Sequence, residues 1–136
     1  MFLNLKNGGF SMPPHIFLTR DTTLAQIQAA FPDRETHDVG TGWYWFALPE
    51  TEYRGRRFLI SLAFCGQTLK SIRFAMADRN AASWDGWSEA YELESLSLYR
   101  RWLAEEIGST GRFDWGGCGA HYDPKSGICN MFVYYA

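Results

Sequence analysis

The chain has little of the residue chemistry on which most enzymes and metal proteins depend. It has only three histidines and three cysteines. No G-x-S-x-G, H-E-x-x-H or P-loop motif occurs in it. No apolar run approaches the roughly 20 residues of a membrane helix, and the N-terminal segment lacks the apolar core of a signal peptide. We therefore expect a cytoplasmic protein with reduced thiols, no cofactor, no bound metal, no enzymatic activity and no membrane partner.

An excess of charge is also missing. The sequence carries 13 basic and 15 acidic residues, a net charge of −2. Proteins that bind nucleic acid need a basic field, so we expect no nucleic-acid partner. The one basic cluster, Arg54, Arg56 and Arg57, predicts a solvated hairpin end rather than a phosphate site. The length of 136 residues suits a single domain over residues 1–136.

Aromatic residues, in contrast, are abundant. They make up 17% of the chain, with six Trp, seven Tyr and ten Phe. Such large side chains bury much apolar surface, and a small domain cannot always hide all of them. Some of these rings are therefore expected to face a groove or a partner.

The first half of the chain predicts one short helix and a β-meander. Thr23 and Gln26 form a capping box, and Pro32 ends the helix that follows it. Segments 42–48, 57–65 and 69–76 are rich in strand-forming residues. Both alternating sets of side chains in 57–65 are largely apolar, which predicts a central strand covered on both faces.

A long helix is predicted from Ser88 to Ile107, with a core stripe of Leu96, Tyr99, Leu103 and Ile107. A second apolar stripe is expected to lie nearly opposite, where a surface helix would normally be polar. This stripe and the tryptophan-rich loop before the helix predict a partner-binding surface. Its residues are Trp84, Asp85, Trp87, Tyr91, Glu94, Leu98, Trp102 and Glu105.

The stretch WGGCGAHYDPKSGIC, residues 115–129, concentrates two cysteines and a histidine. Its Asp-Pro-Lys-Ser-Gly turn predicts a β-hairpin in which Asp123 pairs with Ile128. Cys118 and Cys129 are then roughly 13 Å apart at about 3.3 Å per residue, too far for a disulfide. His121 faces away from both cysteines. A loop one residue different in length would separate the two cysteines onto opposite faces, so neither register forms a metal site.

The same register explains the glycines of this hairpin. Gly117 and Gly119 fall opposite Tyr134 and Phe132, whose rings can fold across the bare backbone. The other face of the hairpin is apolar enough to belong to the core.

Several of these segments together resemble a set of small bacterial proteins encoded in toxin-delivery gene neighbourhoods. The similar segments are LNLKNGGF, GWYWF, WDGWSEAYE, YRRWL and FDWGGCGAHYDPKSG, which extend over most of the chain. Such proteins are often immunity proteins, so the resemblance implies a toxin as the protein partner. It brings no catalytic motif, and no residue takes a role from it.

The sequence thus predicts an α+β fold: a mainly antiparallel sheet of five or six strands, with one short and one long helix packed on it. The predicted function is a binding protein that neutralises a toxin by occluding its active surface. One alternative is a small-molecule-binding or hydrolytic domain with an aromatic pocket near Trp43 and Trp45. Another is a homodimer in which the second helix face is the dimer interface.

Overall fold

The computed structural model describes residues 1–79, 88–108 and 110–136. In this part of the chain one large antiparallel sheet has eight strands, and a separate pair forms a small hairpin. The sheet order is β3 (Thr36–Asp38), β4 (Trp43–Ala47), β6 (Arg56–Cys65), β7 (Thr68–Met76), β10 (Ile128–Tyr135), β9 (Gly116–Asp123) and β8 (Gly111–Phe113), with β5 (Thr51–Tyr53) also paired to β6. The small hairpin joins β1 (Phe10–Met12) and β2 (Ile16–Leu18).

The α+β class and the antiparallel sheet agree with the sequence prediction, but five or six strands was too low a count. β1, β2, β3, β5 and β8 have only three residues each. Three residues give a single alternation of side chains, which is too little to recognise as a strand in the sequence.

Both helices begin and end at the signals in the sequence. Helix α1 (Leu24–Ala30) has the predicted capping box, in which Gln26 N donates to Thr23 Oγ1 at 3.2 Å and Thr23 N donates to Gln26 Oε1 at 2.9 Å. A 3-10 turn, η1 (Ala77–Arg79), follows β7. Helix α2 (Glu89–Ile107) is capped by Ser88 and ends at Gly108, which has a φ of 71°.

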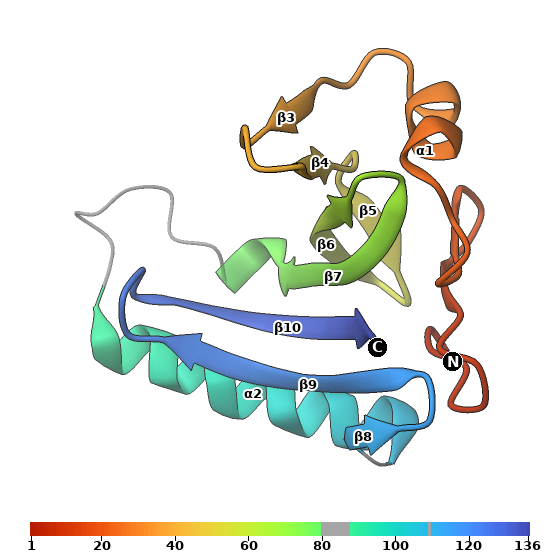
Figure 1. Cartoon of the computed structure of the whole chain (residues 1–136). Coiled ribbons are helices and arrows are strands. Elements are labelled where there is room, and N and C mark those ends of the chain that lie inside the picture. The colour runs from red at the N-terminus through yellow and green to blue at the C-terminus, as the bar shows by residue number, and fades with distance from the viewer. Residues whose placement is uncertain (80–87, 109) are drawn as a thin grey trace.

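The core lies on one face of the large sheet. Helix α2 runs along β9 and β10, and the N-terminal segment lies beside the end of β10 (Figure 1). Tyr135 Oη donates to the carbonyl of Gly8 at 2.7 Å, which fixes this segment against the sheet. Phe2 at the start of the chain is fully buried and its ring lies 5.5 Å from that of Phe74 on β7.

Within the described residues, the second face of strand β6 is not covered along its whole length. Phe58, Ile60 and Leu62 are buried in the core, whereas Leu59 between them is 37% exposed. The prediction that β6 is covered on both faces is therefore wrong. The apolar residues on the second side of β6, such as Leu59, lie on a face of the sheet that no other described segment covers.

Helix α2 also departs from its predicted orientation. Tyr99, Leu103 and Ile107 are buried as expected. The Trp102 ring, however, stacks on Phe2 at 5.1 Å and packs against Phe58 at 5.2 Å. Trp102 follows Tyr99 by three positions, and such residues are neighbours on a helix surface rather than opposite. The expectation that Trp102 projects away from the core is thus wrong.

The C-terminal hairpin has the predicted register. Asp123 pairs with Ile128, Tyr122 with Cys129, and Cys118 with Val133. The turn is held by the Asp123 carboxylate, which accepts hydrogen bonds from Lys125 N at 3.0 Å and Ser126 Oγ at 3.1 Å. This register determines which side chains of β9 and β10 share the uncovered face.

Candidate functional site

The face of the large sheet opposite the core is the most unusual surface of the described chain, and we call it the open face. Pairing across the strands puts Trp45, Ala63, Ser71 and Tyr134 in one row on this face. Ser61, Arg73, Phe132 and Gly119 form the next row. Directly opposed residues in an antiparallel sheet project to the same side, so these rows form one continuous surface.

Exposed apolar side chains gather on the open face. Seven large hydrophobic residues are exposed in the described part of the chain, and three of them lie on this face. These three are Trp43, Leu59 and Ile128, with exposed fractions of 38%, 37% and 45%. Single exposed apolar residues are ordinary, but their concentration on one face is typical of an interaction surface.

Trp45 and Arg73 occupy the centre of this face. The Arg73 guanidinium carbon lies 4.8 Å from the centroid of the Trp45 ring, a cation–π arrangement. Beside the pair is an open hollow of about 400 Å³. Its lining consists of Trp45, Leu59, Ser61, Arg73, Phe74, Ala75, Ile128 and Asn130.

Two stacked rings on β10 extend the apolar surface of the open face toward β9. The ring centroids of Phe132 and Tyr134 lie 6.1 Å apart, and the two ring planes make an angle of 28°. A Cβ on Gly119 would lie 3.1 Å from the tip of the Phe132 ring, and one on Gly117 would lie 2.5 Å from the Tyr134 ring. The rings therefore fold flat across the glycines, as the sequence predicts, and keep this half of the face shallow.

The helix surface predicted from the sequence lies only partly within the described residues. Trp84, Asp85 and Trp87 lie outside the described residues. Trp102 and Leu98 pack against the core from its margin. The role of this helix surface in partner binding stays a prediction.

Arg79 occupies the start of this predicted surface. Its guanidinium lies 3.9 Å from the Tyr91 ring centroid and 3.4 Å from the Glu94 carboxylate. The Tyr91 hydroxyl donates to the carbonyl of Asp78 at 3.4 Å. Glu94 and Glu105 remain exposed. The tyrosine and the nearer glutamate thus already have partners within the chain.

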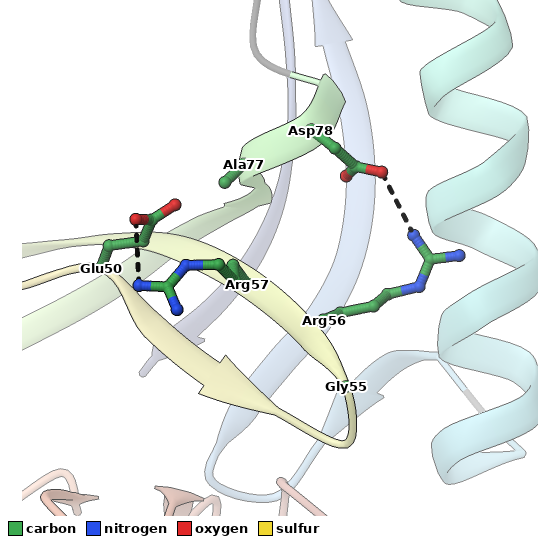
Figure 2. Close-up of a pocket in the computed structure, with 6 residues that line it drawn as sticks. All are labelled: Glu50, Gly55, Arg56, Arg57, Ala77 and Asp78. Carbon is green, nitrogen blue, oxygen red and sulfur yellow. Dashed lines mark ion pairs between the residues drawn. The ribbon is translucent and has the colours of Figure 1, made fainter.

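The basic cluster of residues 54–57 is a hairpin end, as the sequence predicts. Arg54 and Gly55 form the turn between β5 and β6, with φ values of 50° and 80°. Figure 2 shows Arg56 and Arg57 pointing away from each other, each toward its own carboxylate. Arg57 pairs with Glu50 at 3.1 Å and Arg56 with Asp78 at 3.9 Å. These residues line a hollow in which a phosphate would have to compete with Glu50 and Asp78 for the two arginines.

The cysteines do not form a reactive centre with His121. Burial raises the pKa of the Cys118 thiol to about 12. Burial, and then the nearby Glu92 carboxylate, raise the pKa of Cys129 to about 11. A thiol with a raised pKa is a poor nucleophile at neutral pH. Within residues 1–79, 88–108 and 110–136, no three His, Cys, Asp or Glu side chains are grouped as metal ligands.

These environments predict a selective alkylation pattern. In the native protein at neutral pH, iodoacetamide should modify Cys65, which is exposed, and leave Cys118 and Cys129 unmodified. After unfolding without reductant, all three should react, because the hairpin register keeps the two buried thiols apart. Intact-mass spectrometry counts the adducts. A mass two daltons lower, with only Cys65 reactive, would contradict the prediction.

Sequence reasoning named Trp43 and Trp45 but missed Leu59, Arg73 and Ile128. One signal could have found them. The strand at 57–65 is apolar on both sides, yet the sequence predicts only two helices, one of them short. One layer of helices cannot cover both faces of a broad sheet.

Comparisons with known proteins identify the fold. No protein-family model matches the sequence, and no curated protein matches it. A solved chain does share the architecture, and it comes from a structure described as "Rhs1-CT in complex with cognate immunity protein RhsI1". The match has a TM-score of 0.63 and 19% sequence identity, and covers 98% of this chain and 85% of the other. Of the helices described here, none combines the length and apolarity needed to cross a bilayer.

Proposed function

We propose that this chain is an immunity-type binding protein that neutralises a bacterial toxin by covering the toxin's active surface. The open face is the observation that carries this proposal. Three large apolar side chains, Trp43, Leu59 and Ile128, are exposed on it, and Leu59 and Ile128 line one hollow with Trp45. Buried aromatic and aliphatic anchors supply most of the affinity of a protein–protein interface. A toxin that covered this face would remove that surface from water.

The shared fold supports the same proposal. The solved neighbour comes from a complex of Rhs1-CT with its cognate immunity protein, and its fold extends over 98% of this chain. Its identity of 19% carries no side-chain correspondence, so the contact residues must be argued from this chain alone. The helix surface with Glu94, Leu98, Trp102 and Glu105 stays a second predicted contact with the toxin.

A small-molecule-binding or hydrolytic role is the second candidate. The observation that favours it is the hollow of about 400 Å³ beside Trp45. Its described lining offers Ser61, Arg73 and Asn130 as polar groups. Hydrolysis by a serine normally needs an adjacent base, and no histidine or carboxylate is among these lining residues. Ligand binding without catalysis is the stronger form of this alternative.

Co-production with the toxin domain encoded by the adjacent gene tests the proposal. The two chains should elute together as a complex of defined stoichiometry, measured by size-exclusion chromatography with light scattering. Cells that express the active toxin should survive only when this chain is present. A toxin domain from an unrelated pair is the matched control and should neither bind nor be neutralised. An adjacent gene for a metabolic enzyme, with no toxin binding, would contradict the proposal.

A further inference from the structure

Arg73 differs from the arginines that form ion pairs in this chain. Arg54, Arg56, Arg57 and Arg79 each lie within ion-pair distance of a carboxylate, with Glu106, Asp78, Glu50 and Glu94 as partners. Among the described residues, no carboxylate lies that close to Arg73. Of the described residues that line the hollow on the open face, Arg73 is the only charged one. The Arg73 guanidinium therefore lies, without a carboxylate partner among the described residues, beside the apolar side chains that line the hollow.

This arrangement constrains what can cover the open face. A partner that buries Trp45, Leu59 and Ile128 must also take the Arg73 guanidinium out of water. Removing a charged group from water without a counter-charge costs more than the apolar contacts return. The partner must therefore bring an acceptor of opposite charge to the same place.

We propose that the open face is the toxin-docking surface, and that it takes a toxin carboxylate flanked by an apolar side chain. The carboxylate accepts hydrogen bonds from the Arg73 guanidinium, and the apolar side chain enters the hollow between Leu59 and Ile128. This inference rests on the proposed function, and it names the contact surface and the chemistry of the toxin epitope.

The stacking on Trp45 prepares Arg73 for this contact. A guanidinium presents its donors in one plane, in a geometry that matches a carboxylate. The Trp45 ring lies 4.8 Å from the guanidinium carbon and limits the conformations of the long side chain. Binding then costs less side-chain entropy than it would for a freely moving arginine.

A second copy of this chain fits the open face poorly. Dimers with twofold symmetry join the same surface of both subunits. A dimer centred on the hollow would bring two Arg73 guanidinium groups together, with no carboxylate among the described residues of either lining. The charge at the centre thus favours a different protein as the occupant.

The test is a calorimetric titration of catalytically inactivated toxin domain from the adjacent gene into four variants of this chain. Arg73→Glu should weaken binding by at least ~30-fold, and Ile128→Gln by ~5–10-fold. The matched controls lie on α2, where Leu93 is 43% exposed, close to the 45% of Ile128. Leu93→Gln and Arg100→Glu should bind within about threefold of wild type. All four should melt like wild type, because each side chain is exposed.

The possible outcomes separate this inference from the proposed function. If wild type binds the toxin and the open-face variants bind equally well, the docking surface is wrong while the function stands. Loss of binding in Leu93→Gln or Arg100→Glu would then move the contact to α2. If wild type binds no toxin, both proposals fail. If wild type forms dimers that Arg73→Glu disrupts, a second copy is the occupant and the docking inference fails.

Discussion

Replacing Trp102 with alanine is expected to lower the free energy of unfolding by about 3 kcal/mol or more. The Trp102 ring packs against Phe2 at 5.1 Å, Phe58 at 5.2 Å and Tyr53 at 6.5 Å. These partners come from the N-terminal segment, β6 and β5. Truncation would leave a cavity where helix α2 meets all three segments. Urea denaturation followed by circular dichroism measures the loss.

Trp43→Ala is the matched control, because it removes the same ring from the open face. Trp43 is 38% exposed at the start of β4. Its removal should cost less than about 1 kcal/mol of stability and should instead weaken toxin binding. The opposite result, a stable Trp102→Ala that no longer binds the toxin, would restore the helix surface as the contact site.

Much of the fold could be predicted where a local signal determines the structure. Ser88 caps the start of α2 and Gly108 follows its last residue, because a capping hydroxyl and a left-handed glycine are strong local preferences. The hairpin register likewise follows from the turn at 124–127, since shifting it by one residue would move every side chain to the wrong face.

The packing of the N-terminal segment could not be predicted. Phe2 and Leu3 are completely buried, although neither lies in a helix or a recognisable strand. Their burial depends on contacts with residues far along the chain, such as Trp102 and Phe74. No periodicity in the first ten residues carries that information.

The orientation of Trp102 was mispredicted for a similar reason. Helical periodicity gives the angle of a side chain about the helix axis, but it does not say how many segments pack around the helix. From helical periodicity alone, Trp102 is predicted to lie on a second, exposed face of the helix. The N-terminal segment, however, places Phe2 against its ring. Conversely, the apolar character of Leu59 predicts a core position. In the described chain no second layer covers this face of the sheet, and Leu59 is 37% exposed.

Gly116→Ala is expected to be among the most destabilising single substitutions in the C-terminal hairpin, with a loss of about 3 kcal/mol or more. A Cβ at this position would lie 1.9 Å from the carbonyl oxygen of Tyr134 and 3.0 Å from the Cα of Tyr135. Both are backbone atoms of β10, so no side-chain rotation relieves the clash. The φ of 152° is also one that residues with a side chain rarely adopt.

Gly119→Ala in the same strand is the control. Its Cβ would meet only the tip of the Phe132 ring, at 3.1 Å, and Gly119 has no positive φ. A small shift of that ring accommodates the methyl group, so the loss should stay within about 1 kcal/mol. Thermal melts of both variants, followed by near-ultraviolet circular dichroism, compare them directly. Gly116 pairs with Tyr135 at the end of β10, and the Tyr135 hydroxyl donates a hydrogen bond to the carbonyl of Gly8. The Gly116→Ala variant should therefore also release the N-terminal segment. Equal melting temperatures for the two variants would mean that β9 and β10 are not joined near Tyr135 as described.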